Sequence, residues 1–268
     1  MQIRSARKRS WRGTQLTRSA MRRLLPAVLL VATSSIAKVH AGPPFYTDDP
    51  EPVDYRHNEF YVFSTLDRSD GTDATQGPAM EYNRGVAHNT QVHVVLPFSG
   101  YSPANGGDAF GLGDVEVGIK YRFVDETTDR PQIGTFPMVE IATGSAARGL
   151  GNGRTWYRLP LWIQKSWGPW TSYGGVGLDI NHAPGMRDST FGGWLVQRDL
   201  SPRLTLGGEV FRQNAQVIGA RGYTLVNLGG YYNFKPDFSL LFSAGRSAAG
   251  EQHTVAYLGL YWTWGSRG

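Results

Sequence analysis

The feature that most constrains the fold is the segment 114–123, where hydrophobic and charged residues alternate one by one. Every second residue of this DVEVGIKYRF run is apolar, and four of the other five are charged. Successive side chains of a β-strand point to opposite faces, so the run predicts a strand with one apolar and one ionic face. Its ten residues could cross a bilayer as a tilted strand. The pattern alone fits either a soluble β-sandwich or a transmembrane β-barrel whose apolar face meets lipid.

Residues 1–41 have the three parts of a secretory signal peptide. Arg22 and Arg23 form the charged end, residues 24–37 are apolar, and small residues precede a predicted cleavage site after Ala41. Residues 21–41 alone would form a complete signal of ordinary length, so Met21 is an alternative start to the first residue. The arginine pair also resembles a twin-arginine signal, although we favour the ordinary secretory route.

The formal charge of +5 comes from this leader, which holds nine Lys or Arg and no Asp or Glu. Without it the chain has 18 basic and 22 acidic residues and a net charge of −4, so no electrostatic argument supports a nucleic-acid partner. The chain has no Cys, and an exported protein without disulfides must gain stability by another route. Closure of a barrel in lipid is one such route, and we expect the protein in the outer membrane of a Gram-negative bacterium.

Period-two patterning recurs in segments of about ten residues along the rest of the chain. We predict strands at 58–66, 76–84, 89–97, 113–123, 132–143, 156–167, 170–181, 190–198, 203–212, 223–234, 238–246 and 253–264. Long Gly-, Ser- and Asn-rich connections alternate with short turns, as in bacterial outer-membrane barrels. The predicted fold class is therefore all-β: a single antiparallel transmembrane β-barrel of about 12 strands (10–14), with short periplasmic turns and longer outer loops.

The predicted domains are a signal peptide over 1–41, an extended N-terminal arm over 42–57 and the barrel over 58–268. We expect the arm to be solvated, although its acidic Asp48-Asp49-Pro50 turn could also bind a cation. Aromatic residues near the predicted periplasmic strand ends indicate an interfacial belt. Pro137 and Pro160 fall inside predicted strands, where the missing N–H interrupts pairing, so those strands are bulged or bounded differently.

The polar residues of the inward parity are the candidate site. We predict as lumen-lining Glu81, Gln91, His93, Asp114, Glu116, Lys120, Arg122, Glu140, Arg158, Gln164, Asp179 and Glu209. They could form a polar core that fills the barrel, or a selectivity lining in which carboxylates face Lys120, Arg122 and Arg158 across a constriction. Arg148 and Arg154 belong to the Gly-rich run 144–154, which we expect to be an outer loop at the pore mouth.

No pattern predicts catalytic, cofactor-binding or metal-binding residues, and we expect the protein not to be an enzyme. The run 144–154 lacks the Gly-Lys-Ser/Thr end of a phosphate-binding loop, and the histidines are dispersed without ligand spacing.

Several blocks of the chain also resemble a known family. They are GPPFYTDDPEPVDYRHNEFY at 42–61, GLGDVEVGIKYRFVDE at 111–126, VEIATGSAARGLGNGRTW at 139–156, LPLWIQKSWGPWTSYGG at 159–175, GWLVQRDLSPRLTLGGEVF at 193–211 and LLFSAGR at 240–246. These blocks resemble outer-membrane transporters grouped as the phenol-degradation meta-pathway family. The resemblance implies a passive outer-membrane channel associated with the uptake of aromatic compounds, and it transfers no individual site residue.

Together these observations predict an outer-membrane channel for passive diffusion of small solutes, among them aromatic or other hydrophobic compounds. The expected partners are outer-membrane lipids, a small-molecule solute and the barrel assembly machinery. Two alternatives remain open: a non-conducting structural or adhesion barrel, and a barrel-embedded lipid-modifying enzyme.

Overall fold

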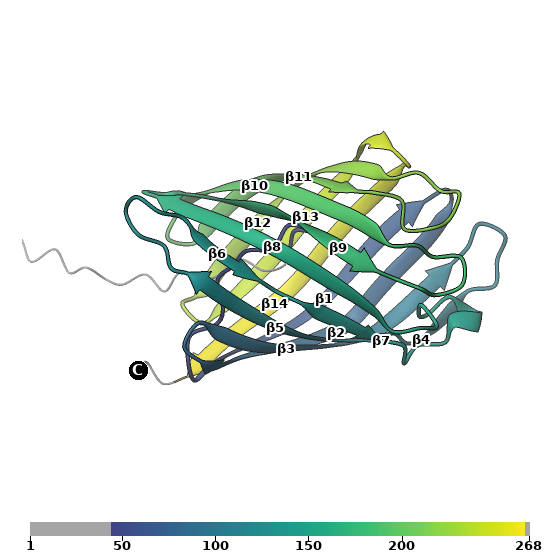
Figure 1. Cartoon of the computed structure of the whole chain (residues 1–268), viewed down its shortest axis with the longest axis horizontal. Helices are drawn as coiled ribbons and strands as arrows, with labels where there is room; N and C mark the ends of the chain where they lie inside the picture. The colour runs from purple at the N-terminus through teal and green to yellow at the C-terminus, as the bar shows by residue number, and fades with distance from the viewer. Residues whose placement is uncertain (1–43, 266–268) are drawn as a thin grey trace, which may run out of the picture. The chain divides into compact units, whose positions relative to one another are not determined.

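A computed structural model describes residues 44–265, which form a closed antiparallel barrel of 12 strands with 2 extra strands (Figure 1). The predicted signal peptide lies outside the described residues. The strands are β1 (His57–Ser69), β2 (Thr72–Ala87), β3 (Thr90–Ser102), β4 (Ala109–Leu112), β5 (Val115–Val124), β6 (Gln132–Thr135), β7 (Met138–Ile141), β8 (Trp156–Trp167), β9 (Trp170–Ile180), β10 (Ser189–Ser201), β11 (Leu204–Gln213), β12 (Tyr223–Lys235), β13 (Phe238–Gly250) and β14 (His253–Gly265). A single 3₁₀ turn, η1, spans Ala146–Arg148.

The barrel closes between its first and last strands. β1 pairs with β14 along its whole length, from His57↔Gly265 to Ser69↔His253. Each wall strand thus has two antiparallel neighbours, which removes the free sheet edges that a bilayer does not tolerate. The predicted fold class is confirmed, including the count of about twelve strands.

One wall position is occupied by two short strands, β6 and β7, where the sequence predicted a single strand. Thr135↔Leu161 and Met138↔Arg158 pair with β8 in one continuous register, so only Phe136 and Pro137 leave the ladder. Pro160 of β8 lies opposite this interruption. The two prolines therefore lack N–H donors at the same point of the wall, and a single defect accommodates both.

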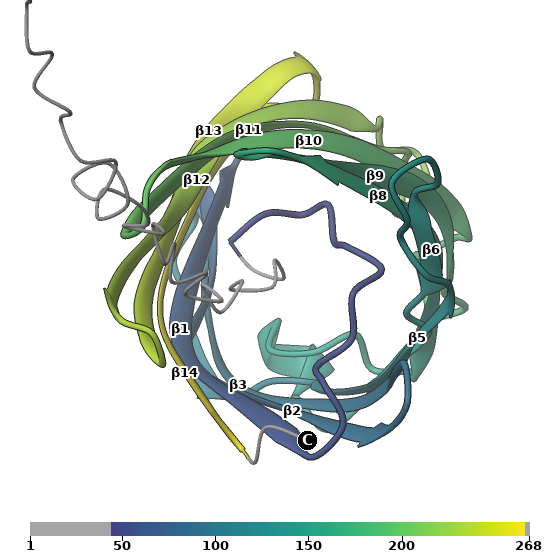
Figure 2. The same ribbon diagram turned by 90° about the vertical axis from the view of Figure 1, so that its left-hand side faces the viewer.

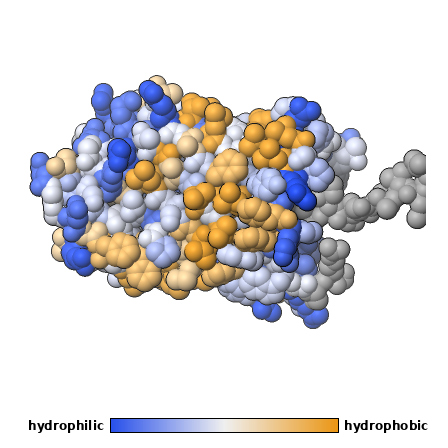
Figure 3. Space-filling view, turned by 180° about the vertical axis from the view of Figure 1, so that it is seen from behind, coloured by the Kyte–Doolittle hydropathy of each residue, from blue (hydrophilic) through white to orange (hydrophobic). Residues whose placement is uncertain are grey.

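Alternating side chains give the barrel an apolar outer face and a mixed inner face. Outward residues such as Leu161, Val176 and Leu228 are exposed, and a hydrophobic band crosses the outside between more hydrophilic ends (Figure 3). In the part of the chain that the structure describes, no helix is long and apolar enough to cross a membrane.

The two ends of the barrel differ. We call the end that carries His57 and Gly265 the terminal end and the opposite one the loop end. Turns at the terminal end are short except 125–131, whereas the loop end carries the long connections 142–155, 181–188 and 214–222. The predicted strands 58–66 and 76–84 left a loop at 67–75, and this prediction was wrong. β1 and β2 both continue into this stretch and are joined by a turn of two residues.

The aromatic belt lies at the terminal end, as predicted. Rings of Phe234, Phe238 and Trp262 stack in succession on the outer face, with centroids 5.3 and 5.0 Å apart. Tyr121, Phe123, Trp167, Trp170 and Trp264 are exposed near the same end. Such rings favour the boundary between hydrocarbon and head groups.

We expect Leu258→Arg to destabilise the barrel by about 2–4 kcal/mol, because Leu258 is exposed on the outer face in the middle of β14. The matched control is Thr65→Arg. Leu258 pairs with Ser64 of β1, and Thr65 is the next residue along that strand, so it lies at the same depth but faces the lumen. Thr65 lines a lumenal cavity together with Asp67, so an arginine there can reach water or a carboxylate. Urea refolding in lipid vesicles measures both variants, and equal losses of stability would contradict the assignment of the two faces.

Candidate functional site

The segment 44–56 does not extend into solvent but runs inside the barrel, where it follows the wall around the lumen (Figure 2). We call it the lumenal arm. From His57 at the terminal end it passes β2, β3, β5, β6, β8, β10 and β11. The Pro44 carbonyl then accepts a hydrogen bond from Ser243 of β13, at 2.6 Å.

The far part of the arm is fixed by a carboxylate of the wall. Glu209 of β11 accepts hydrogen bonds from the backbone N–H groups of Tyr46, at 3.2 Å, and Thr47. The Asn227 side-chain amide donates to the same carboxylate, at 3.2 Å. The Tyr46 ring packs on Phe211, with centroids 5.3 Å apart. A carboxylate that accepts several N–H groups can remain buried, so Glu209 serves as an anchor for the arm.

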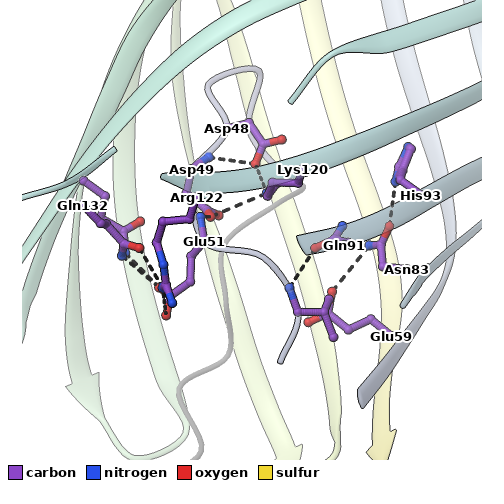
Figure 4. A network of polar contacts seen from close by, with 12 residues as sticks. Asp48, Asp49, Glu51, Glu59, Asn83, Gln91, His93, Lys120, Arg122 and Gln132 are labelled. Carbon is purple, nitrogen blue, oxygen red and sulfur yellow. Dashed lines mark hydrogen bonds and ion pairs between the residues drawn. The ribbon is translucent and has the colours of Figure 1, made fainter. Parts of the chain in front are cut away.

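The middle of the arm is held by an ion pair (Figure 4). The Lys120 ammonium of β5 lies 3.0 Å from Asp48 Oδ1 and 3.5 Å from Asp49 Oδ1, and 4.9 Å from the centre of the Phe136 ring. Burial raises the pKa of the Asp49 carboxyl to about 8, although the nearby ammonium opposes this rise. Both acidic side chains of the turn contact the single ammonium of Lys120.

The part of the arm nearest the terminal end is held by amides. Glu51 Oε2 accepts from Gln164 of β8 at 3.0 Å and from Gln132 of β6 at 3.2 Å. Arg122 of β5 donates to Gln132 Oε1 at 3.0 Å and lies 3.9 Å from Glu51. The Val53 N–H donates to Gln91 of β3 at 2.9 Å.

Glycines of the wall make room for the arm. A Cβ atom on Gly193 would lie 3.2 Å from Thr47 Cβ and closer still to its hydroxyl, and one on Gly134 would lie 3.0 Å from Pro50. Thr47 and Asp49 are fully buried. The expectation of a solvated arm was therefore wrong: the acidic turn pairs with Lys120 inside the barrel.

A central chamber of about 240 Å³ lies between the arm and the opposite wall. His93 links polar groups on two sides of the chamber. One ring nitrogen lies 2.6 Å from Asn83 Oδ1, and the other lies 2.7 Å from Glu116 Oε1. Asn83 donates to Glu81 at 2.8 Å. Aromatic rings complete the lining, contributed by Phe45, Tyr46, Tyr61, Phe136 and Trp162.

A larger outer cavity of about 600 Å³ opens toward the loop end. Its rim includes residues 149–151 of the Gly-rich connection, which Asp114 holds in place. Asp114 accepts from the backbone N–H of Gly144 at 2.8 Å and of Asn152 at 2.6 Å. Arg148 and Arg154 lie in this connection and are exposed, with their guanidinium groups donating to backbone carbonyls of Phe110 and His182.

A third cavity of about 760 Å³ lies at the terminal end, beside Arg122 and the turn 125–131. The three cavities meet at shared residues. Phe45, Tyr46 and Arg158 line both the outer cavity and the central chamber, and Glu51 lines both the chamber and the terminal cavity. These residues lie where one cavity borders the next.

Nine of the twelve predicted lumen residues line one of the three cavities. Glu81, Gln91, His93, Glu116, Lys120 and Arg158 line the central chamber, Asp114 and Glu140 line the outer cavity, and Arg122 lines the terminal cavity. Gln164 and Glu209 bind the arm, and Asp179 pairs with Arg158 at 2.8 Å. Lys120 and Arg122 face the arm, whereas in the selectivity lining that the sequence left open they would face carboxylates across a constriction.

Two groups of site residues escaped the sequence analysis. One is the arm, whose acidic residues are equally typical of a solvated segment. The other is the set of inward rings, such as Tyr61 and Trp162, which are buried in the lumen. Their strand parity, shared with Glu59 and Gln164, is the signal that could have found them.

No described group of three or more His, Cys, Asp or Glu side chains is arranged to hold a metal ion, within residues 44–265. The three cavities instead combine charged, polar and aromatic lining residues. A lined lumen of this kind inside a closed barrel with an apolar outer face defines the class of protein: a single-chain antiparallel transmembrane β-barrel.

Solved structures share this fold. The COG4313 outer membrane channel from Pseudomonas putida F1 superposes with a TM-score of 0.66 at 16% identity, covering 84% of this chain and 100% of that chain. KdgM porin gives a TM-score of 0.53 at 9% identity, covering 76% and 99%, and NanC porin gives 0.52 at 8%, covering 76% and 98%. No family model and no curated protein sequence matches this chain.

We expect Glu209→Ala to release the far part of the arm. Because the chain has no Cys, Thr47→Cys provides a single thiol at a fully buried site. Leaving two buried N–H groups without an acceptor costs about 1–3 kcal/mol each, and about 1.4 kcal/mol already gives a tenfold effect. Maleimide labelling of the thiol should therefore accelerate at least tenfold in the Glu209→Ala background.

Ser239→Ala is the control for this labelling experiment. Ser239 is a buried wall residue that donates to Asn233 at 2.7 Å and has no hydrogen bond to the arm. Equal labelling rates in the two backgrounds would show that Glu209 does not hold the arm.

Proposed function

We propose that this protein is an outer-membrane channel through which small solutes diffuse passively, narrowed by its own lumenal arm. The observation that carries the proposal is the series of three neighbouring cavities, which share Phe45, Tyr46, Arg158 and Glu51 as lining residues. Twelve strands enclose more space than an eight-stranded barrel, whose interior side chains can fill, and less than a sixteen-stranded open pore. Passage would follow the gradient, without a covalent step.

The arrangement also supports a solute with an aromatic or apolar body. Phe45 and Tyr46 line both the outer cavity and the central chamber, and Trp156 and Tyr257 add rings to the outer cavity. The sequence blocks that resemble the phenol-degradation meta-pathway family support the same solute class. Membership of that family is part of this proposal. In this scheme the terminal end faces the periplasm and the loop end faces the exterior.

Bilayer conductance of refolded residues 42–268 tests the channel. We expect small discrete currents from the wild type, because the arm occupies much of the lumen. Glu209→Ala should raise the single-channel conductance severalfold by releasing the far part of the arm, whereas Ser239→Ala should leave it unchanged.

Two other outcomes would count against the proposal. A barrel that is folded in lipid yet silent in both the wild type and Glu209→Ala would favour the non-conducting structural barrel. An equal single-channel conductance in the wild type and Glu209→Ala would place the conducting path away from the three cavities.

A further inference from the structure

The three cavities share an excess of negative charge. The central chamber is lined by Asp48, Glu51, Glu59, Glu81 and Glu116 against Lys120, Arg158 and His93. The outer cavity has Asp67, Asp114 and Glu140 against Arg158, and the terminal cavity has Glu51, Asp125 and Glu126 against Arg122, Lys165 and His88. Acidic groups thus outnumber Lys and Arg in every cavity, so the whole path should attract cations.

The two fixed cations of the chamber are already engaged. Lys120 is bound by Asp48 and Asp49 of the arm. Arg158 makes a two-pronged pair with Asp179 at 2.8 and 3.2 Å, and its guanidinium lies 4.4 Å from the centre of the Phe191 ring. Both are held by carboxylates that neutralise them, so neither is left to attract an anionic solute.

On the opposite wall, Glu81 and Glu116 face His93, and the charge of Arg158 also acts on Glu116. His93 lies 3.5 Å from Glu81 and 2.7 Å from Glu116. Because Arg158 is already paired with Asp179, even a fully protonated His93 balances only one of these two carboxylates. Charge left unbalanced in a low-dielectric lumen is costly, so this wall favours the approach of a positive group.

The other side chains that line the chamber indicate what the uncharged part of the ligand should be. Phe45, Tyr46, Tyr61 and Phe136 present rings, which attract organic cations through their π-systems as well as apolar surface. Trp162 is 2% exposed, and its indole N–H has no partner among the described residues. That buried donor points independently to a ligand that also carries a hydrogen-bond acceptor.

Resting on the channel proposed above, we propose that the central chamber binds and passes organic ammonium compounds with a single aromatic ring, preferring those with a hydroxyl close to the ammonium group. The ammonium would lie beside His93 against the carboxylates of Glu81 and Glu116, the ring among the aromatic walls, and the hydroxyl against Trp162. A volume of about 240 Å³ lies below the roughly 300–1,000 Å³ of drug-sized pockets, which suits one ring.

Calorimetric titration of the detergent-solubilised protein with three probes of one shape tests the charge preference. They are 2-phenylethylammonium, neutral 2-phenylethanol and phenylacetate. We expect the ammonium to bind at least tenfold more tightly than either other probe. Glu81→Gln with Glu116→Gln should abolish this advantage and leave the weak binding of 2-phenylethanol unchanged. Equal binding of the three probes by the wild type, or tighter binding of phenylacetate, would overturn the proposal.

Two further variants test whether the binding site is the one assigned. Glu126→Gln removes a carboxylate of the terminal cavity that pairs with Lys165 at 3.3 Å, and it should leave ammonium binding intact. Trp162→Phe tests the hydroxyl contact. It should remove the severalfold tighter binding expected for 2-amino-1-phenylethanol over 2-phenylethylammonium, while the affinity for the latter stays the same. Loss of binding in Glu126→Gln, or no effect of Trp162→Phe on this difference, would contradict the assigned site.

Reversal potentials in a potassium chloride gradient separate this inference from the channel itself. A cation-selective wild type that becomes less selective in the Glu81 and Glu116 double variant supports both. An anion-selective current would refute the ammonium preference and leave the channel standing. Absence of current would refute the channel, while the titration still decides whether the chamber binds ammonium.

Discussion

The structure depends on the need to pair every polar group inside a closed wall that lipid surrounds. Barrel closure lets the backbone N–H and C=O groups of the wall form hydrogen bonds, because each wall strand has two neighbours. It also sends every second side chain into a narrow lumen, where charges such as Lys120 and Glu209 must find partners or water. The lumenal arm supplies those partners: its carboxylates meet the basic groups of the wall, and its N–H groups meet Glu209. Wall and arm therefore form one polar system.

Much of the wall could be predicted from sequence, because its signal is local. Alternation identified the twelve strand positions, and Pro137 marked the break between β6 and β7. Strand ends were less predictable at the loop end, where β1 and β2 continue past the apolar band as a polar hairpin. The Arg68–Asp73 pair at 2.6 Å joins the two strands there, in a stretch whose composition resembles that of a loop.

The candidate site was half predictable. Parity placed the twelve polar residues inward because each belongs to a strand with a clear apolar face. The arm could not be placed in this way, since its partners are distant in sequence: 163 residues separate Tyr46 from Glu209, and 199 separate Pro44 from Ser243. Nothing in the composition of a short acidic, Pro-rich segment distinguishes a partner in solvent from one inside the barrel.

The order of the arm's contacts has a consequence for assembly. The arm precedes β1 in the chain, yet its far part is held by β11 and β13, which are among the last strands to be made. Contacts between such distant residues form late, after the intervening loops have closed. In the finished barrel the seam between β1 and β14 encloses the arm. A chain whose arm missed the interior would close around Lys120 and Glu209 without the partners that the arm supplies.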